Sequence, residues 1–172
     1  MTKYFLIILL FCSCNQRPNP FNPNDWYQER KERILSESNL PTDSTSIERY
    51  ENGKAHKVKS FNHGHPTVEK WYRETGEQVV QTNYSRDGLF ELRREICKDG
   101  KPLFEGIFYK GQGYGPSTWW RCGRSKEEEG VRFKDLKIGV WKYWDTSGKV
   151  SEADYKNGNI IDSLQWIKDV GD

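Results

Sequence analysis

The chain lacks a hydrophobic run long enough to cross a membrane, and it lacks an excess of charge of one sign. Its longest apolar run, 4–11, is far shorter than the roughly 20 residues that a membrane-spanning helix needs. Lysine and arginine total 27 against 25 for aspartate and glutamate, and the two signs are interleaved without a basic stripe. Binding to a phosphate backbone depends on such a stripe, so we expect no nucleic-acid partner.

The sequence also lacks the short motifs of common catalytic sites. It contains no nucleophile elbow, phosphate loop, metalloprotease helix or paired cysteine–histidine arrangement. His63 and His65 lie two residues apart, with His56 upstream, and alternate residues of a strand face the same way, as a metal site would require. No cysteine or carboxylate completes that set, and Gly64 between the two histidines is typical of a turn. We therefore expect no metal, no cofactor and no enzyme activity.

Aromatic residues, by contrast, are abundant. They make up 14% of the chain and include seven tryptophans, whereas charged residues make up 30%. The high charge alone would favour disorder, but so many aromatic residues argue for a folded core. The length suits one domain, with a thin aromatic core and a charged surface that keeps it soluble.

The first residues have the pattern of an export signal. Lys3 precedes the apolar run 4–11, which has the length of a signal-peptide core. The following Leu-Phe-Cys-Ser-Cys resembles a bacterial lipoprotein cleavage site, and Cys14 is the better lipidation candidate because small Ser13 precedes it. The resemblance implies a signal peptide over 1–13 and a lipid anchor on Cys14 in the cell envelope. The alternatives are an ordinary signal peptide and a plain hydrophobic N-terminus. Asn15, which is not acidic, favours the outer membrane over the inner one.

A tether and a short helix are expected before the main domain. Residues 14–24 are rich in proline and asparagine, which favours an extended tether. In 25–46 we expect a short helix capped by Asn24 or Asp25, then a loop over 36–46 rich in serine, threonine and proline. The apolar face of that helix consists of Trp26, Tyr27, Ile34 and Leu35.

Glycines recur at nearly equal steps through the middle of the chain, with spacings of 11, 12, 12, 12, 11 and 12 residues. The series consists of Gly53, Gly64, Gly76, Gly88, Gly100, Gly111 and Gly123, and Gly148 and Gly158 occupy further repeat turns. A period of this size, with a turn residue closing each unit, predicts one strand and one turn per unit. We therefore expect residues 47–172 to form an all-β domain, an elongated antiparallel meander of repeated β-hairpins.

Aromatic residues precede these turns at two spacings. In one kind an aromatic residue lies three positions before the glycine, as Tyr50 does before Gly53 and Phe61 does before Gly64. In the other kind, paired aromatics lie four and five positions before it, as Trp71 and Tyr72 do before Gly76. Within 90–96 the residues alternate as in a half-buried strand, with an apolar face of Phe90, Leu92 and Ile96 and a polar face of Glu91, Arg93 and Glu95. The repeat aromatics are Trp71, Tyr72, Trp119, Trp141, Tyr143, Trp144 and Tyr155.

The segment 139–150, Gly-Val-Trp-Lys-Tyr-Trp-Asp-Thr-Ser-Gly-Lys-Val, continues to Tyr-Lys-Asn-Gly at 155–158. This pattern resembles the MORN-repeat-variant family, and a second match runs over 64–88, while the units over 88–123 keep only the period. The resemblance covers about two thirds of the chain. It implies an elongated sheet of consecutive hairpins, and because some similar bacterial proteins are antitoxins, it suggests binding to a protein.

Two irregularities interrupt the period. The step from Gly123 to Gly139 is 16 residues and includes 125–130, Ser-Lys-Glu-Glu-Glu-Gly, which predicts a protruding loop. Residues 111–116 hold three glycines and a tyrosine, which predicts a flexible loop. One interpretation is a solvated hairpin tip and a bulge; the other is a partner-binding surface. The candidate partner-binding residues are Tyr114, Glu127, Glu128 and Glu129.

Export would expose Cys97 and Cys122 to an oxidising compartment, which favours a disulfide. In a flat meander, however, these residues lie two strand spacings apart, roughly 9.6 Å, beyond the roughly 7 Å between α-carbons that a disulfide spans. We therefore expect both cysteines to be free and buried, unless the glycine-rich segment folds back.

Together these features predict a lipid-anchored repeat scaffold that binds a protein in the bacterial envelope, with an antitoxin or immunity role as a narrower form. The alternative is a glycan-binding surface lipoprotein in which Trp119, Trp120, Trp141 and Trp144 form a platform for sugar rings. The repeat pattern itself also accounts for these tryptophans as core residues.

Overall fold

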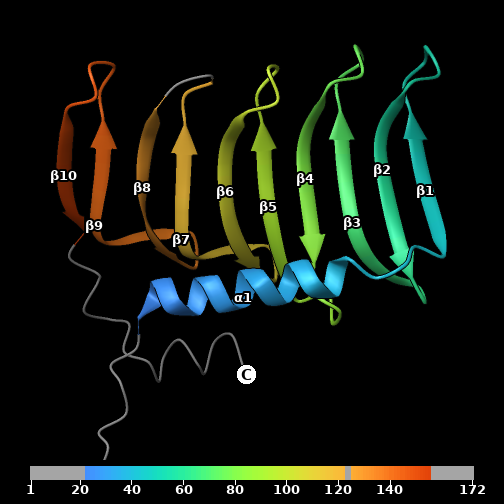
Figure 1. Cartoon of the computed structure of the whole chain (residues 1–172), viewed down its shortest axis with the longest axis horizontal. Coiled ribbons are helices and arrows are strands. Elements are labelled where there is room, and N and C mark those ends of the chain that lie inside the picture. The colour runs from blue at the N-terminus through green and yellow to red at the C-terminus, as the bar shows by residue number, and fades with distance from the viewer. Residues whose placement is uncertain (1–21, 123–124, 156–172) are drawn as a thin grey trace, which may run out of the picture.

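A computed structural model describes residues 22–122 and 125–155. It consists of a single ten-stranded antiparallel sheet in the order β1 to β10, with one helix, α1, packed on it (Figure 1). Each strand pairs only with its neighbours in the sequence, and the sheet does not close into a barrel. The predicted all-β meander of sequential hairpins with a short N-terminal helix is therefore confirmed.

The strands are six to nine residues long. They are β1 (Ser44–Arg49), β2 (Ala55–Asn62), β3 (His65–Tyr72), β4 (Gln78–Tyr84), β5 (Phe90–Ile96), β6 (Pro102–Tyr109), β7 (Gln112–Trp120), β8 (Lys126–Phe133), β9 (Leu136–Trp144) and β10 (Val150–Tyr155).

Helix α1 runs over Pro23–Ser38 and is longer at both ends than the sequence predicted. Its cap is Asn22, whose side chain accepts a hydrogen bond from the Asn24 N–H at 2.9 Å. Pro23 occupies the first turn, where its missing N–H costs nothing and its fixed φ suits the helix. The expected caps, Asn24 and Asp25, lie inside the helix, so the tether predicted over 14–24 overlaps it. The expected loop over 36–46 is reduced to 39–43.

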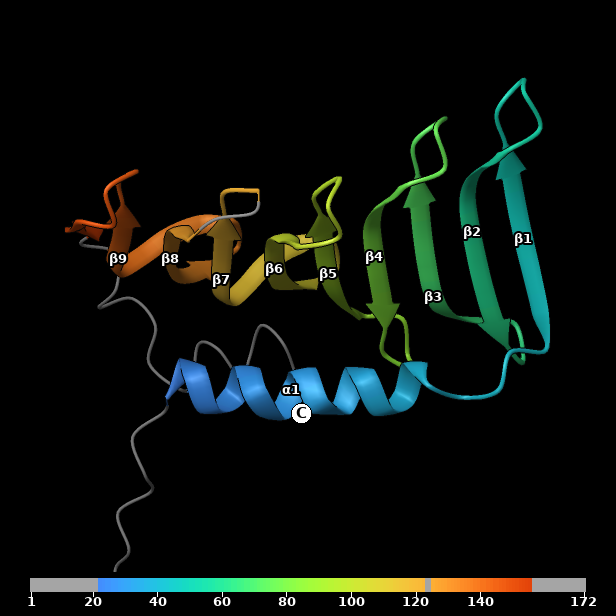
Figure 2. The same ribbon diagram turned by 45° about the horizontal axis from the view of Figure 1, so that its top comes forward.

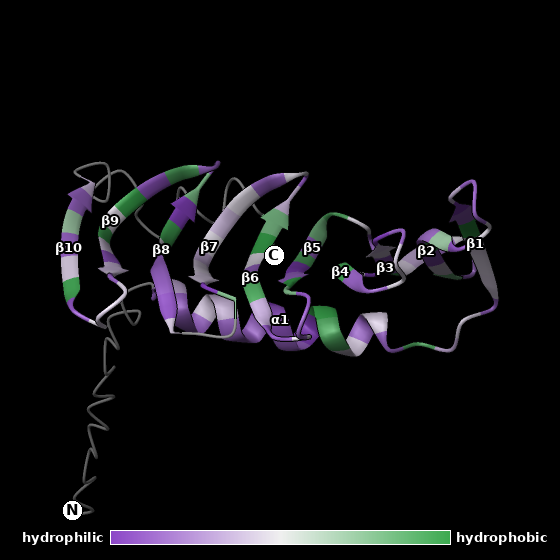
Figure 3. Cartoon of the chain, turned by 90° about the horizontal axis from the view of Figure 1, so that it is seen from above, coloured by the Kyte–Doolittle hydropathy of each residue, from purple (hydrophilic) through white to green (hydrophobic). Residues whose placement is uncertain are grey.

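The core lies between α1 and one face of the sheet (Figure 2). Tyr27 and Ile34 are buried against sheet residues, and Trp26 and Leu35 pack beside them, so the predicted apolar face of the helix is confirmed. The sheet contributes Phe90, Leu92, Ile107, Tyr114, Phe133 and Ile138. Hydrophobic segments accordingly gather from β5 to β9, whereas β1 to β3 are mostly hydrophilic (Figure 3).

A half-buried carboxylate joins α1 to the middle of the sheet. Glu105 of β6 accepts hydrogen bonds from Tyr27 Oη at 2.8 Å and from Arg94 Nε at 2.7 Å, and it also pairs with Lys31. Burial alone would raise the pKa of Glu105, but the three donors hold it below its usual value. The helix is therefore fixed by a specific polar contact as well as by apolar packing.

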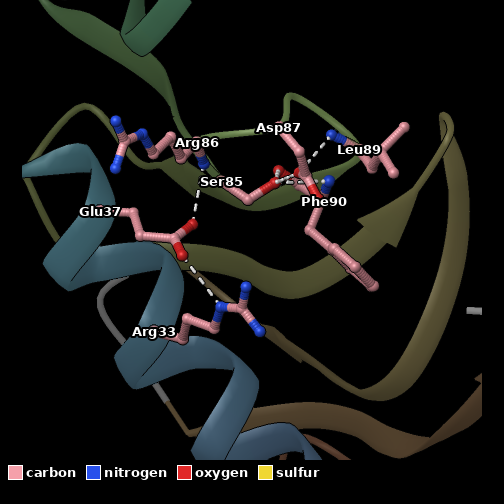
Figure 4. Close-up of polar contacts among 7 residues, drawn as sticks. All are labelled: Arg33, Glu37, Ser85, Arg86, Asp87, Leu89 and Phe90. Atoms are coloured by element: carbon pink, nitrogen blue, oxygen red, sulfur yellow. Dashed lines mark hydrogen bonds and ion pairs between the residues drawn. The ribbon is translucent and has the colours of Figure 1, made fainter. Parts of the chain in front are cut away.

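The C-terminal part of α1 is tied to the β4–β5 turn (Figure 4). Glu37 accepts hydrogen bonds from the Arg86 N–H at 2.8 Å and from Arg33 Nε at 2.9 Å. The turn is held by Ser85, whose hydroxyl accepts from the Phe90 N–H at 2.9 Å. These contacts set the position of the helix along β4 and β5.

The turns alternate between the upper and lower edges of the sheet in Figure 1. The upper turns are 50–54, 73–77, 97–101, 121–125 and 145–149, and in each the N–H of the first residue donates to the carbonyl of the fifth. The turn at Gly53, which the aromatic spacing grouped with that at Gly64, therefore has the same hydrogen bonding as the turn at Gly76. The predicted turn glycines at positions 53, 64, 76, 88, 100, 111 and 148 have positive φ.

The long step between Gly123 and Gly139 does not contain an insertion. The β8–β9 turn is made by Lys134 and Asp135, with φ of 50° and 66°, so Asp135 occupies the position that a glycine has elsewhere. Counted to Asp135, the period stays at 12 residues, and Gly139 lies within β9. Residues 126–130 belong to β8 rather than to a protruding loop, so that prediction was wrong.

The flexible loop expected over 111–116 was also wrong, whereas the alternative interpretation of this segment as a bulge is confirmed. Only Gly111 belongs to the β6–β7 turn, and the rest forms β7 with a bulge opposite Gly106 and Ile107. Gly115 has a φ of +78°, and a Cβ there would lie 2.8 Å from the Trp26 ring. A glycine is therefore needed for α1 to approach the bulge, and the extra glycines serve packing, not mobility.

Cys97 and Cys122 form a disulfide, with their Cα atoms 5.5 Å apart. The prediction of free cysteines was wrong because it assumed a flat sheet. Both residues lie in upper turns, and bulges beside them at Glu95/Ile96 and Trp119/Trp120 change the strand ends. Successive upper turns also touch elsewhere. For example, Tyr50 Oη donates to the Tyr72 carbonyl at 2.7 Å.

The predicted signal peptide 1–13, most of the tether including Cys14, and the turn glycines Gly123 and Gly158 lie outside the described residues. Within 22–122 and 125–155, the helix found is neither long nor apolar enough to cross a membrane.

Candidate functional site

The face of the sheet opposite α1 is the candidate interaction surface. Because Leu92 packs towards the helix, its neighbours Glu91 and Arg93 point to the other side. Strand pairing places Glu69, Thr82 and Arg93 in one row across β3, β4 and β5. We call this side the open face, since no other described element covers it (Figure 2).

In the C-terminal half of the open face, cations cover the aromatic rings. Lys137 Nζ lies 4.1 Å from the centre of the Trp141 ring, and Arg132 Cζ lies 4.8 Å from that of Trp119. Trp141 is fully buried, with 0% exposure, and its Nε1 donates to the Val131 carbonyl at 3.1 Å. These repeat aromatics therefore act as a second core layer, with Tyr143 and Tyr155 joined by a hydroxyl contact of 2.7 Å.

The predicted partner-binding residues lie in two different places, the core and strand β8. Tyr114 is a core residue with 2% exposure, so it is not available to a partner. Glu127, Glu128 and Glu129 lie in β8, and each forms an ion pair, with Arg121, Lys137 and Lys126 respectively. Glu127 and Glu128 line one small pocket beside Trp119 and Tyr143, whereas Glu129 lines another pocket on the α1 side of the sheet, so the three do not form one acidic patch.

In the N-terminal half of the open face, the same cation–ring arrangement surrounds a shallow hollow. Lys57 Nζ lies 4.8 Å from the centre of the Trp71 ring, and Lys59 Nζ lies 4.9 Å from that of Tyr84. The hollow has a volume of about 510 Å³. Its walls include the rings of Tyr50, His56, Trp71 and Tyr84 and the carboxylates of Glu69 and Glu91.

Two carboxylates face one tyrosine in this hollow. Tyr84 and Glu91 are directly paired across β4 and β5, and Glu69 accepts a hydrogen bond from Trp71 Nε1 at 2.7 Å. Burial, and then the Glu69 charge, raise the pKa of Glu91. Burial and the two carboxylates also raise the pKa of Tyr84. The Tyr84 phenol therefore stays protonated, and ionisation of Glu91 is less favourable than it would be in water.

His63 and His65 line one small pocket beside the β2–β3 turn, and His56 lies apart from them. His63 is in the β2–β3 turn with a φ of 49° and an 86% exposed side chain, as expected for residues flanking a hairpin turn. His56 instead lines the hollow, with its ring 4.6 Å from Tyr50 and 5.3 Å from Trp71 between centroids. Among the described residues there is no group of three or more histidine, cysteine, aspartate or glutamate side chains placed to hold a metal ion.

Sequence reasoning missed the hollow. It placed Glu91 and Arg93 on a polar strand face and expected such faces to contribute to partner binding, but it named neither of them, nor Glu69 or Tyr84, as a candidate site residue. The alternation in 90–96 indicated which residues share a face, but the meeting of Glu69 with Glu91 depends on the registers of β3, β4 and β5. Those registers are set by turns and bulges that the sequence did not reveal.

Comparisons with known proteins do not assign the chain to a group. No family model matches it, and no curated protein matches it at a significant level. The features that bear on function are therefore the open face, its hollow and the N-terminal sequence.

Proposed function

We propose that this protein is a scaffold that binds another protein through the open face and is anchored by lipid in a bacterial envelope. The observation that carries the proposal is the uncovered face of a ten-stranded sheet. A sheet face normally packs against another layer, so a long uncovered face lined by aromatic and charged side chains is typical of an interaction surface.

Two features support export. The sequence from Lys3 to Cys14 has the pattern of a lipoprotein signal, and the Cys97–Cys122 disulfide suits an oxidising compartment. Because disulfides are rare where thiols are kept reduced, the bond is independent support for an extracytoplasmic location. We infer attachment through Cys14, with the outer membrane favoured by Asn15.

The resemblance to MORN-repeat variants agrees with the hairpin architecture and suggests a narrower role as an antitoxin or immunity protein. Such a role needs a single tight protein partner. It is part of the proposal, and identification of the partner would test it.

Site-specific photo-crosslinking in native membranes tests the interaction. A photo-reactive residue replaces Ser46 of β1 or Ser151 of β10, which are exposed on the open face at opposite ends of the sheet. The matched control replaces Glu32, which is exposed on α1. We expect one defined crosslinked protein from the open-face positions and none from the helix position. Equal crosslinking from all three positions, or none from any, would contradict the proposal.

The anchor has a separate test. Mass spectrometry of the mature N-terminus should find a diacylglyceryl group on Cys14, and the Cys14→Ser variant should leave the membrane fraction. A mature N-terminus elsewhere, or retention of the variant in the membrane, would contradict lipid anchoring at this residue.

Glycan binding is the second candidate, since the hollow combines Trp71 and Tyr84 with two carboxylates able to hydrogen-bond hydroxyl groups. Against it, Lys57 and Lys59 already lie over those two rings. Titration with envelope polysaccharide, followed by tryptophan fluorescence, tests this candidate. A flat titration would remove it, and a saturable change would favour it over protein binding.

A further inference from the structure

Glu91 differs from the other carboxylates of the open face in β1 to β5. Glu48 pairs with Lys57, Glu69 with Lys59 at 3.2 Å, and Glu95 with Arg93 at 2.9 Å. Glu91 is half-buried in the hollow but forms no hydrogen bond or ion pair through its side chain with any described residue. A partly buried carboxylate without a partner is unfavourable, so its presence calls for an explanation.

The nearby cations do not supply that partner. Lys59 is bound to Glu69, and Arg93 uses Nη2 for Glu95, while its Nε is buried and makes no hydrogen bond. Both cations lower the pKa of Glu91 from a distance, but burial and the Glu69 charge outweigh them. The hollow therefore contains one negative charge that the described residues do not neutralise by contact.

The geometry points to a lysine or arginine side chain of the protein partner as the occupant of this hollow, with its charged group at Glu91. The inference rests on the proposed function, because it specifies which chemistry on the partner is recognised. Tyr84 lies directly opposite Glu91 across β4 and β5, and Lys59 already lies over its ring, so the incoming side chain would be recognised by the Glu91 carboxylate rather than by Tyr84. Its cation would give Glu91 the positive partner that Glu48, Glu69 and Glu95 already have on this face.

This site predicts that one substitution acts in opposite directions on folding and on binding. Glu91→Gln keeps the size of the side chain and removes the unfavourable charge, so the free protein becomes more stable. The same change removes the charge that the incoming cation needs. Substitution of a residue with only a structural role would not raise the stability of the free protein while weakening binding.

The test uses the full chain and small peptide probes. The probe is acetyl-Gly-Arg-Gly-amide, with acetyl-Gly-Gln-Gly-amide and acetyl-Gly-Glu-Gly-amide as neutral and anionic controls. Binding is followed by the indole NMR signal of Trp71, assigned by its loss in Trp71→Phe. We expect saturable binding of the arginine peptide only, weakened at least ~10-fold by Glu91→Gln, as for loss of a charge-assisted hydrogen bond.

Glu51→Gln is the matched control, because Glu51 is exposed in the neighbouring β1–β2 turn and does not line the hollow. It removes the same charge and should leave binding of the arginine peptide unchanged. Equal binding of the neutral or anionic peptide, no binding of any peptide, or an equal effect of both substitutions would overturn the inference. If the peptide result is negative while open-face crosslinking still yields a partner, the inference fails but the proposed function stands. If neither experiment gives binding, both fail.

Discussion

Removal of the Cys97–Cys122 disulfide should destabilise the protein without changing its fold. The two residues are separated by 25 positions, so the bond closes a loop of about that length. The chain-entropy relation then gives a stabilisation of roughly 3.5 kcal/mol at 25 °C, mainly through restriction of the unfolded state. For a chain of this size each kcal/mol corresponds to about 2–4 °C in Tm, so we expect Cys97→Ser/Cys122→Ser to lower Tm by about 7–14 °C.

Urea unfolding followed by tryptophan fluorescence gives the free energy of unfolding with and without a reductant. The reductant should destabilise the native protein by the same amount as the double substitution, and it should have no effect on the variant. Far-UV circular dichroism of the variant checks that the sheet is retained. These comparisons separate loss of the bond from damage caused by the substitutions.

The pairing itself is checked by trypsin digestion without reduction. Cleavage after Arg94, Lys98, Arg121 and Arg124 should release residues 95–98 and 122–124 as one disulfide-linked peptide. If both thiols are alkylated without a reductant, the pairing is wrong, and the upper turns do not approach each other as described. If the linked peptide is present but its loss costs less than about 1 kcal/mol, the loop-closure reasoning is wrong.

Three further substitutions test the packing and the charges. Glu105→Ala should lower the free energy of unfolding by about 2–4 kcal/mol, because three donors lose their acceptor. The contribution of Glu105 should be fully present above its pKa in the unfolded state and lost as pH falls through its lower folded pKa. A loss of stability that does not depend on pH would contradict this. Gly115→Ala should lower the free energy of unfolding by about 2 kcal/mol or more, because the positive φ and the contact with Trp26 both oppose a Cβ there. Gly111→Ala is the control: it also has a positive φ but open space around it, so it should cost only about 1 kcal/mol. Equal losses would refute the close approach of α1. Glu91→Gln should stabilise the free protein at pH 7 and leave its stability unchanged below the unfolded pKa, because the raised folded pKa makes ionisation of Glu91 unfavourable. A pH series of thermal melts measures this, and a destabilised variant at pH 7 would contradict it.

The corrections share a physical cause. The sequence indicates where strands and turns lie, but it does not indicate how neighbouring turns are oriented or where bulges occur. The spacing between glycines suggested an insertion after Gly123, because the next turn has Asp135, and not a glycine, at the position of positive φ. The glycines around Tyr114 suggested mobility, whereas Gly115 is required by its close approach to Trp26, which is distant in the sequence. At Gly115 a local pattern was therefore given a local reason although a long-range contact was the cause.

The sequence by itself determined the meander, the helix with its apolar face and the regular hairpin period, because these depend on turn chemistry and on local alternation of side chains. Only the tertiary structure decided that Cys97 meets Cys122, that Tyr114 is buried, and that Glu91 faces Glu69 in a hollow. These outcomes depend on strand register, bulges and sheet curvature, which arise from the packing of all ten strands and α1 together. Contacts between side chains on different strands change with a shift of one residue, and no single segment specifies that shift.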